Sequence, residues 1–353
     1  MKILVISLAG IGDTLFATPL IHELRANFPG ATIDALVRWS GAKFLENNPH
    51  LNSVYQRDLA GESKAGALRF LLTLRRNGYD VSFNTHPQSN RLYRLAARVI
   101  GARTRISHEY ECSGAFDRLL VNKSIPQDYS RHAVENNLSL LAFAGAKPLL
   151  PSHRYEIFLT DAEKAWADKF IAQESLSGRK LLGIHAGSGA TKNLALRRWP
   201  LENYIELVRR LREKLPDMTV LFFGGPEEKS DYEKIKAAPG TGKVLFPQTE
   251  NLLQAAALIG KCDAFLSVDT SLMHVAAAMN VKRQTVIETP TWNKPIEPYG
   301  NPFVLVKNPA VAGRNLDYYR YDGAGIKGTP EELRRCMTSV KVEDVLNAVM
   351  KSF

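Results

Sequence analysis

The side chains best suited to hold an anion lie in one short stretch, where an apolar run ends and an alanine-rich segment begins. Asp269, Thr270 and Ser271 follow the run, and all three residue types cap helix N-termini, because their oxygens accept unpaired backbone N–H groups. A helix N-terminus can hold a phosphate or another anion. His274 follows Ser271 by three residues and faces the same side of the expected helix. A capped helix with a buried, merely structural histidine would show the same pattern. The other loops are therefore needed to distinguish an anion site from a structural cap.

A second polar loop is rich in glycine. Gly187 and Ser188 offer backbone N–H groups that could form a concave phosphate site. Lys192 and Arg197 follow, and the spacing leaves open which of them reaches the same oxygens, whereas Arg198 is expected to point elsewhere. Two loops and one cation would clamp a diphosphate and stabilise the charge on a departing nucleoside diphosphate. The sequence has no Walker motif and no metal-ligand cluster, so we expect neither a metal nor a cofactor.

The first expected strand ends in a turn with a candidate catalytic residue. Gly10 and Gly12 permit a tight turn into a helix, with Asp13 at its start. Leu15 stands where the dinucleotide fingerprint requires a third glycine, which argues against a nicotinamide or flavin cofactor. Asp13 could simply be an N-cap worth about 1 kcal/mol. It could also be a general base, an effect of about 10²–10⁴-fold, although a helix N-terminus would lower its pKa and weaken it as a base.

Size and composition indicate a two-domain enzyme. The chain has 353 residues, and single cores stop growing near about 250–300 residues. Its apolar content of 45% is ordinary for a globular protein, and no apolar stretch approaches the roughly 20 residues that span a bilayer. Three widely separated cysteines predict neither disulfides nor a zinc site, so we expect a reduced, cytosolic protein.

The net charge of +10 is concentrated in residues 57–105, which contain ten basic and three acidic residues. This excess favours an anionic partner, either a phosphorylated substrate or an acidic membrane face. We assign Arg57 and Lys64, together with Gly12, to acceptor binding. A solvated helix surface would explain any single one of these arginines. Nucleic acid ranks last, because no RNA-binding aromatic motif or helix-turn-helix pattern is present.

Strands and helices alternate in both halves, which predicts two doubly wound parallel sheets with ligands at the carboxyl ends of the strands. We place a linker at 147–151 and domains at 1–150 and 151–353; the final helix, 342–351, could pack back on the first domain. Expected strands are 2–8, 31–37, 52–56, 80–84, 103–107, 180–185, 218–223, 243–246 and 283–287, besides the strand before Asp269. Expected helices include 41–47, 64–77, 89–100, 129–144, 161–175, 201–214 and 250–260.

Together these motifs resemble the ADP-heptose:lipopolysaccharide heptosyltransferases of glycosyltransferase family 9, which adopt the two-domain GT-B fold, and the likeness covers nearly the whole chain. It rests on the following segments: Met1–Val5, Gly12–Leu15, Thr18-Pro19, His185–Ser188, Arg197–Pro200 and Ser267–Ala278. The resemblance implies a facing pair of domains, the first binding an acceptor and the second a nucleotide sugar.

The resemblance also implies roles for single residues. The aspartate matching Asp13 is the family's proposed base, and Asp269 matches a position near the sugar. Arg197 matches the basic residue near the phosphates, with Lys192 as a rival. The remaining positions lie around the diphosphate or the nucleoside: Ser188, Thr270, Ser271 and His274 for the former, Glu228 and Thr249 for the latter. The chain departs from the family where Ser271 replaces a usual glycine, and the loop between Ser188 and Arg197 is longer.

The function implied is an inverting, metal-independent transfer of heptose from ADP-heptose to the lipopolysaccharide inner core. The expected partners are the nucleotide sugar, an acidic lipid-linked acceptor and the inner face of the cytoplasmic membrane, which the enzyme would contact peripherally. Two alternatives stay open. One is an enzyme of the same fold with another nucleotide sugar or a non-lipid acceptor, and the other is a non-catalytic nucleotide-sugar-binding protein.

Overall fold

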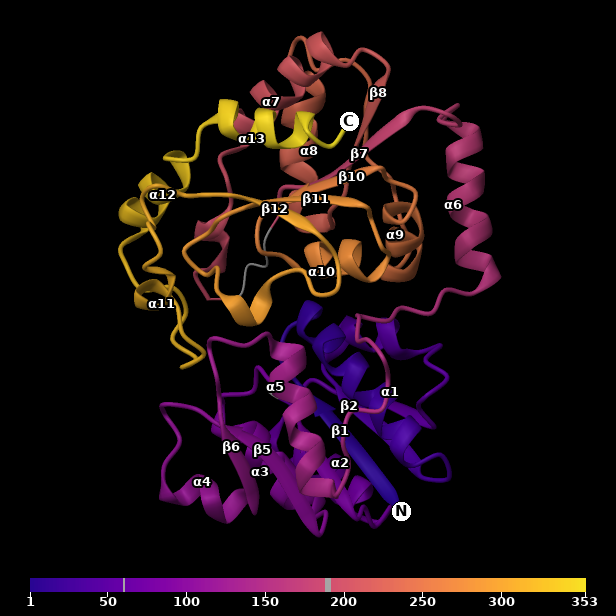
Figure 1. Ribbon diagram of the computed structural model, residues 1–353, viewed down its shortest axis with the longest axis vertical. Helices are drawn as coiled ribbons and strands as arrows, with labels where there is room; N and C mark the ends of the chain where they lie inside the picture. The colour runs from indigo at the N-terminus through magenta and orange to yellow at the C-terminus, as the bar shows by residue number, and fades with distance from the viewer. Residues whose placement is uncertain (60, 188–191) are drawn as a thin grey trace. The chain divides into compact units, whose positions relative to one another are not determined.

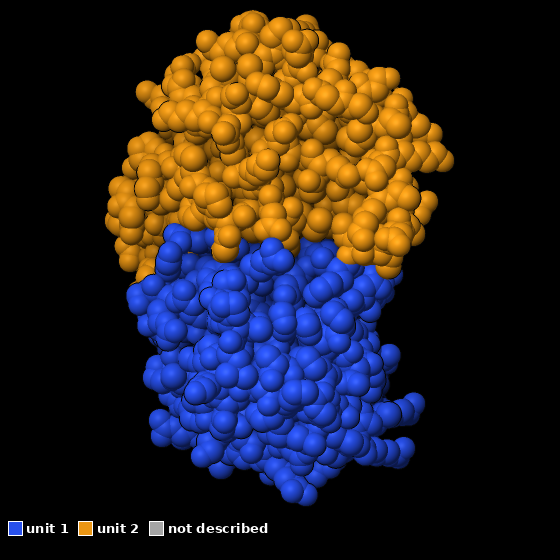
Figure 2. Space-filling view, turned by 45° about the vertical axis from the view of Figure 1, so that its right-hand side comes forward, with its two compact units in different colours: residues 1–158, 294–299, 321–323 blue, residues 159–293, 300–320, 324–353 orange. Residues whose placement is uncertain are grey.

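The computed structural model describes residues 1–59, 61–187 and 192–353. The chain divides into two compact units, which are coloured separately in Figure 2. Unit 1 comprises residues 1–158, 294–299 and 321–323, and unit 2 comprises residues 159–293, 300–320 and 324–353. Two short segments from late in the chain are therefore part of the first unit. The boundary at 158 lies a few residues beyond the predicted linker.

Unit 1 is built on a parallel sheet in the order β3-β2-β1-β4-β5-β6. The central strand, β1, is almost completely buried from Ile3 to Ile6, as expected for a parallel strand that is covered on both faces. The bounds in this sheet are β1 Lys2–Ser7, β2 Thr32–Val37, β3 Ser53–Gln56, β4 Val81–Asn84, β5 Thr104–Glu109 and β6 Lys123–Pro126.

Helices cover both faces of this first sheet (Figure 1). One face carries α2, α3 and α4, whereas α1 packs with α5. The α-helices are α1 Thr18–Asn27, α2 Lys64–Arg75, α3 Arg91–Ile100, α4 Ala115–Leu120 and α5 Ala133–Ser139, and the 3-10 helices are η1 Gly12–Ala17, η2 Trp39–Leu45, η3 Leu140–Ala144 and η6 Lys294–Ile296.

Unit 2 repeats the plan with a parallel sheet in the order β12-β11-β10-β7-β8-β9. In each sheet, the chain thus adds two strands on one side of the first strand and then returns to add three strands on its other side. The strands are β7 Lys180–His185, β8 Met218–Phe222, β9 Val244–Leu245, β10 Ala264–Ser267, β11 Arg283–Ile287 and β12 Phe303–Val306.

The last helix of unit 2 packs in the core of that unit. Val345, Leu346 and Val349 of the final helix are buried in the core of unit 2, where that helix contacts α7, so its packing on the first domain is not observed. The helices are α6 Asp161–Gln173, η4 Leu194–Arg197, α7 Leu201–Lys214, η5 Pro226–Glu228, α8 Lys229–Ala237, α9 Leu252–Ile259, α10 Ser271–Ala278, α11 Asn315–Tyr318, α12 Pro330–Thr338 and α13 Val342–Met350. Among the described residues, no helix combines the length and the apolar composition needed to cross a bilayer.

Several elements differ from the sequence expectations. The predicted helix 129–144 begins only at Ala133 and tightens into the 3-10 helix η3. Strands β6 and β12 and helices α4, α11 and α12 were not predicted from the sequence. Strand β6 has the sequence Lys-Ser-Ile-Pro and lies at the sheet edge, so it lacks the apolar run that marks a central strand.

The predicted linker 147–151 is fastened to α1 by buried polar groups. Glu23 is fully buried, and its carboxylate accepts the N–H groups of Leu149 and Leu150 at 2.8 Å. His153 Nε2 also lies 2.8 Å from that carboxylate. Burial by itself opposes ionisation, but the hydrogen bonds from His153 and the two amides outweigh it and lower the pKa of Glu23.

Replacing Glu23 with Gln should reduce the free energy of unfolding at neutral pH by about 1–3 kcal/mol, since an amide NH₂ would then face backbone donors. The pKa of Glu23 is lowered on folding, so the charge stabilises the protein above the unfolded pKa, near 4.3. The wild-type advantage should disappear as the pH falls from there through the folded pKa. Urea unfolding of E23Q and wild type tests this. The control is Glu46→Gln, whose exposed pair with Lys43 should matter little.

Candidate active site

The strand order of the second sheet brings several candidate residues to one edge. The order in which strands are added to the sheet reverses between the parallel neighbours β7 and β10, and ligands of doubly wound sheets bind at the carboxyl ends of the strands at this point. His185 ends β7, and Asp269 and Thr270 follow β10 directly. These loops come from positions about 85 residues apart in the chain and meet because their strands are neighbours.

A buried ion pair holds the first of these loops. Arg197 Nη1 donates to Asp269 Oδ2 at 2.6 Å, and only 14% of the arginine side chain and 9% of the aspartate side chain are exposed. The hydroxyl of Thr291, after β11, donates to the same oxygen at 2.6 Å. Asp269 thus joins the loops after β7, β10 and β11. Thr291 was not among the predicted site residues.

A second contact joins the cap of α10 to the end of β7. Thr270 is the N-cap of α10, as predicted, and its hydroxyl accepts the Met273 N–H at 3.4 Å. His185 Nδ1 lies 2.9 Å from that hydroxyl. Since the hydroxyl accepts one proton, it can donate its own to Nδ1, which would place the ring proton on Nε2. Ser271, at the first position of the helix, is half-buried beside this cap.

Both histidines of this edge are uncharged at neutral pH. Burial, then the charges of Arg198 and Arg197, lower the pKa of His185 to about 3. Burial and the charge of Arg197 lower the pKa of His274 to about 3 as well. His274 is 3% exposed, so the buried, neutral histidine of the first interpretation is what the structure shows. Its contribution to phosphate binding stays a prediction.

The loop after β8 adds a carboxylate against the glycine-rich loop. Glu228 is buried; its Oε2 accepts the Gly225 N–H at 2.9 Å and its Oε1 accepts from Arg198 Nη2 at 3.1 Å. A β-carbon at Gly187 would overlap the Glu228 carboxylate, so this position needs a glycine for the close approach. Arg198 points toward Glu228 and not toward the pair of Arg197 and Asp269, in agreement with the prediction.

The other donor-site candidates lie further out or outside the described residues. Lys192 is exposed with φ of +56°, and its neighbour Asn193 binds the backbone of Ile326. Of the two candidate cations, Arg197 is the one paired with Asp269. Which of the two binds the phosphates stays a prediction. Thr249 is half-buried in the loop between β9 and α9. Ser188 lies outside the described residues.

Asp13 lies at the carboxyl edge of the first sheet, on the 3-10 helix η1. The expectation of an N-cap is wrong: Ile11 is the cap residue, and the Asp13 carboxylate instead reaches back to accept the Gly10 N–H at 2.7 Å. A β-carbon at Gly10 would lie 2.8 Å from Asp13 Oδ2, so glycine permits this contact. Gly12 is buried at the start of η1. The tight turn holds the carboxylate by its own backbone.

Two tyrosines that interact with the charge of Asp13, and an arginine that interacts with one of them, were not predicted from the sequence. Burial raises the pKa of the Tyr93 hydroxyl, and the charges of Arg38, Asp13 and Asp58 also act on it. Burial likewise raises the pKa of Tyr155, with a further contribution from Asp13. Arg38 follows β2, the neighbour of β1, and pairs with Asp58 at 3.0 Å. Its position after β2 is the signal that could have identified it.

Arg57 and Lys64 do not join Asp13 in a cluster. Arg57 follows the edge strand β3 and makes two hydrogen bonds to Glu62, of 3.0 and 2.8 Å. Its guanidinium also lies 5.1 Å from the ring centre of Phe70. Lys64 is exposed at the start of α2. Their assignment to acceptor binding stays a prediction.

Unit 1 also contains a buried polar network at the ends of β4 and β5 that the sequence analysis did not identify. Asn137 Oδ1 accepts the His86 N–H at 2.7 Å and lies 3.3 Å from His108 Nε2. His86 Nδ1 lies 3.0 Å from the hydroxyl of Tyr110, and its ring meets that of Tyr321 edge-on, with centres 4.5 Å apart. Burial lowers the pKa of both histidines, that of His108 to about 4. This network connects the ends of β4 and β5.

Comparison with known proteins identifies the family. The model of glycosyltransferase family 9 (heptosyltransferase) matches residues 67–317. The chain belongs to glycosyltransferase family 9. It is 27% identical over 291 residues to lipopolysaccharide heptosyltransferase 3 of Escherichia coli, covering 76% of this chain and 78% of that protein. It is 28% identical over 299 residues to lipopolysaccharide heptosyltransferase 2 of E. coli K12, covering 79% of this chain and 80% of that protein.

Solved structures confirm the GT-B fold of this family 9 glycosyltransferase. The family 9 glycosyl transferase of Veillonella parvula has a TM-score of 0.77 at 20% identity, covering 99% of this chain and 96% of the other. The E. coli ADP-heptose LPS heptosyltransferase II has a TM-score of 0.71 at 22% identity, covering 100% and 98%. E. coli heptosyltransferase WaaC with ADP-2-deoxy-2-fluoro heptose has a TM-score of 0.70 at 17% identity, covering 100% of both chains.

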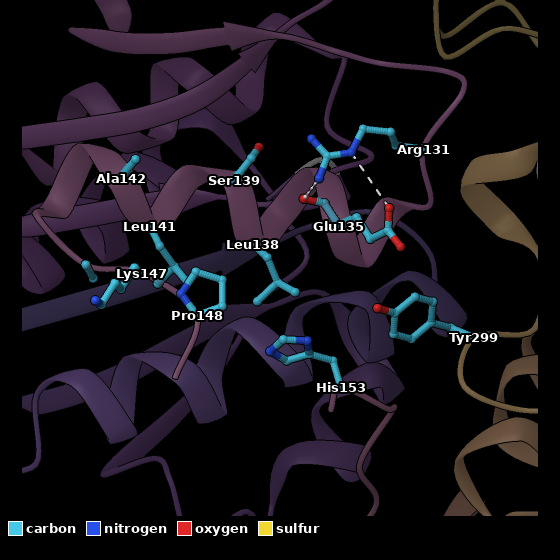
Figure 3. A pocket seen from close by; sticks show the side chains of 11 residues that line it. Arg131, Glu135, Leu138, Ser139, Leu141, Ala142, Lys147, Pro148, His153 and Tyr299 are labelled. Carbon is cyan, nitrogen blue, oxygen red and sulfur yellow. Dashed lines mark hydrogen bonds and ion pairs between the residues drawn. The ribbon is translucent and has the colours of Figure 1, made fainter. Parts of the chain in front are cut away.

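One hollow of this family 9 glycosyltransferase lies away from the predicted residues. It has a volume of about 350 Å³ and lies in unit 1 between α5, η3 and the segment 146–148 (Figure 3). Arg131 and Glu135 in its lining pair with each other at 3.7 Å, and His153 is bound to Glu23. No residue predicted for the donor, the acceptor or the base lines it.

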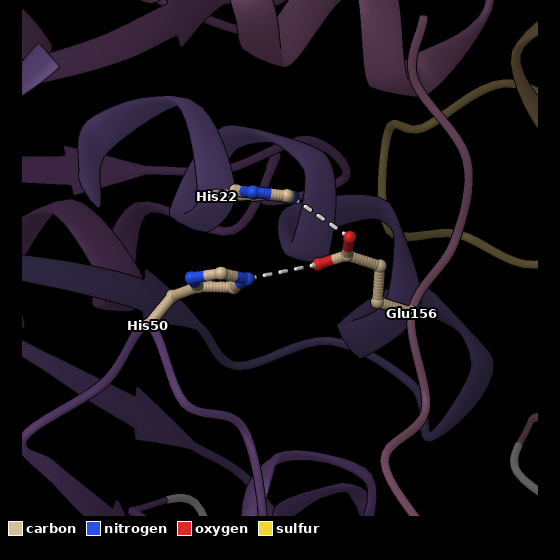
Figure 4. A group of neighbouring side chains, drawn as sticks. All are labelled: His22, His50 and Glu156. Atoms are coloured by element: carbon tan, nitrogen blue, oxygen red, sulfur yellow. Dashed lines mark hydrogen bonds and ion pairs between the residues drawn. The ribbon is translucent and has the colours of Figure 1, made fainter. Parts of the chain in front are cut away.

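His22, His50 and Glu156 form the cluster of possible metal ligands found among the described residues (Figure 4). His22 Nδ1 lies 2.8 Å from one Glu156 oxygen and His50 Nε2 3.8 Å from the other. The two rings are stacked, with centres 3.9 Å apart and planes inclined by 15°. A metal ion bound through ring nitrogens lies near the plane of each ring, and two stacked parallel rings cannot share such an ion. The cluster is therefore suited to hydrogen bonding.

Arg197 should influence the pKa of both site histidines, whereas Arg198 should influence only that of His185. In Arg197→Met, the pKa of both His185 and His274 should rise, because Arg197 lowers both. In the matched variant Arg198→Met, the pKa of His185 should rise while that of His274 stays near 3. Both values should stay below 6.5, since burial is the larger cause and persists. Imidazole ¹⁵N chemical shifts followed across pH measure this; a His274 shift in R198M contradicts the geometry.

Proposed function

We propose that this glycosyltransferase transfers heptose from ADP-heptose to the inner core of lipopolysaccharide, with inversion and without a metal. The observation that carries the proposal is the cluster at the carboxyl edge of the second sheet, where Arg197, Asp269 and Thr291 join the loops after β7, β10 and β11 in a chain of family 9. Two relatives are named lipopolysaccharide heptosyltransferases, and a solved relative binds an ADP-heptose analogue.

The donor would bind to unit 2. The N-terminus of α10, with Thr270 and Ser271, and the backbone of Gly187 and Ser188 would donate to the diphosphate. Arg197 would supply the cation. Its pairing with Asp269 fixes the direction of the guanidinium before any ligand arrives, which reduces the entropy cost of binding. Neutral His274 would add an N–H donor and no charge.

The two acidic residues of unit 2 would contact the sugar and the nucleoside. Asp269 would face the sugar beside Arg197. Glu228, with Thr249 in the neighbouring loop, would receive the nucleoside, because a carboxylate accepts two hydroxyl donors well. Arg198 orients Glu228 through the 3.1 Å contact and offsets the cost of burying its charge.

The reaction would begin at Asp13 in unit 1. Its carboxylate takes the proton of an acceptor hydroxyl while the hydroxyl oxygen attacks the anomeric carbon from the face opposite ADP. The bond from that carbon to the phosphate oxygen breaks, and ADP leaves with the electron pair, so the configuration inverts. The same opposite-face geometry governs inverting glycosidases. Gly12, Arg57 and Lys64, and Arg38 near Asp13, would hold acidic groups of the acceptor.

The acceptor that we propose is linked to lipid. The reaction would therefore take place at the inner face of the cytoplasmic membrane, in peripheral contact with it. The basic excess of residues 57–105 supports this placement, since it complements both acidic core sugars and anionic head groups.

Asp13→Asn should abolish transfer and leave the ADP affinity nearly unchanged, because the amide cannot take the proton. Loss of a general base costs about 10²–10⁴-fold in rate. Product formation from ADP-heptose and a core acceptor measures the first effect, and calorimetry with ADP the second. Asp128→Asn, at a half-buried aspartate that accepts hydrogen bonds from Ser130, is the control. Retained turnover in D13N would remove Asp13 as the base.

Glu228→Gln should weaken ADP binding by about tenfold, since a hydrogen bond to a charged group contributes about 1.5–3 kcal/mol. The adjacent Glu227 is exposed, so Glu227→Gln is a matched control that should bind ADP like wild type. Calorimetry with ADP, UDP and GDP makes the measurement. Preference for UDP or GDP in the wild type would point to another nucleotide sugar, and binding without transfer to any acceptor would point to a non-catalytic protein.

A further inference from the structure

Exposed apolar side chains gather on three helices of unit 1. Among the described residues, nine large apolar side chains are exposed, and six of them lie on α2, α3 and α4. Each helix contributes two, spaced by three or four residues so that they share one side of the helix. The six are Leu68 and Leu72 of α2, Leu92 and Leu95 of α3, and Phe116 and Leu119 of α4, with exposed fractions from 42% to 68%.

The topology of the first sheet places these helices together. The chain crosses from β3 at one edge back to β4, then continues outward through β5 to β6. Right-handed crossovers put α2, α3 and α4 on the same face of the sheet, where α2 contacts α3 and α3 contacts α4. The guanidinium of Arg91 lies 5.6 Å from the ring centre of Phe116 and links the last two helices. We call the exposed sides of α2, α3 and α4 the outer helical face.

The charge of the outer helical face is of one sign. Six exposed basic residues lie on the three helices: Lys64, Arg69, Arg75, Arg91, Arg98 and Arg118. The single acidic residue in these helices, Asp117, is buried and pairs with Arg91 at 3.3 Å and Arg94 at 3.4 Å. The surface thus offers leucine and phenylalanine among cations, with no exposed carboxylate on the helices.

We propose that the outer helical face docks on the surface of an anionic phospholipid bilayer. Leucine and phenylalanine side chains would enter the boundary between head groups and acyl chains, while the surrounding cations meet phosphate groups, as in amphipathic helices that lie on membranes. Charge complementarity favours an anionic bilayer as the partner, because the exposed charges of the outer helical face are all positive. The proposal rests on the proposed function, because docking would bring the enzyme to a lipid-linked acceptor. Membrane binding itself can be measured without the transfer reaction.

Vesicle flotation with the full chain tests the docking. Wild type should float with vesicles that contain phosphatidylglycerol, should not float with pure phosphatidylcholine, and should be released by salt. The apolar variant Leu68→Ser/Leu92→Ser/Leu119→Ser should bind anionic vesicles at least about tenfold more weakly. The charge variant Arg69→Gln/Arg98→Gln/Arg118→Gln should lose roughly 100-fold, since each basic residue near an anionic surface contributes roughly a factor of five.

The matched control is Leu149→Ser/Val304→Ser, which removes two exposed apolar side chains elsewhere and should float like wild type. Equal melting temperatures would show that the surface variants fold. Unchanged flotation of the apolar variant overturns the proposal, as does wild type that ignores vesicles but self-associates through this face in sedimentation. Transfer to a water-soluble core oligosaccharide should persist in the apolar variant. Wild type that floats but transfers nothing would refute the proposed function alone, and wild type that transfers but does not float would refute the docking alone.

Discussion

The reversal of strand order at the first strand of each sheet is the constraint on which the rest of the structure depends. Parallel strands joined by right-handed crossovers send every carboxyl end to one edge, and the reversal leaves two neighbouring loops that diverge. In unit 2 these are the loops after β7 and β10, and in unit 1 the loops after β1 and β4. Asp13, Thr270 and Asp269 reach their positions for this reason.

Three arginines near these edges are each matched by a carboxylate. Arg197 pairs with Asp269, Arg198 with Glu228 and Arg38 with Asp58. A buried charge is tolerated only with such partners, so the pairs hold the loops in place while offering charge to a ligand. Burial and the charges of the arginines lower the pKa of the nearby histidines, so they stay neutral at pH 7. Binding of an anion at this edge then depends on arginine and backbone amides, and not on histidine charge.

The two faces of the first sheet have different surfaces. Helix α1 is fastened by the buried Glu23 to the segment that leads out of unit 1, so it belongs to the rigid part of the fold. Helices α2, α3 and α4 cover the other face with fully buried alanines and leucines inward and with exposed leucines and arginines outward. The outward apolar pair on each of these three adjacent helices does not contribute to the core. The outer helical face is therefore a candidate for contact with a lipid bilayer.

Local sequence patterns determined much of the fold. The apolar runs before Asp13 and Asp269 correctly indicated central parallel strands, because such strands are buried on both faces and leave a continuous signal. Thr270 was one of three residues recognised as N-cap candidates, and it is the N-cap of α10, through a contact that spans only three residues. The edge strand β6 and the short helix α4 were missed, because half-exposed elements carry no periodic apolar run.

Contacts between distant residues were decided by the tertiary structure alone. The pairing of Arg197 with Asp269 spans 72 residues, and the proximity of Arg38 to Tyr93 depends on strand order. Spacing could not choose between Lys192 and Arg197, because loop geometry depends on what the loop packs against. Sequence thus determined which residues have suitable chemistry and where the strands end. Which of them meet is a consequence of the packing of strands and helices remote in the chain.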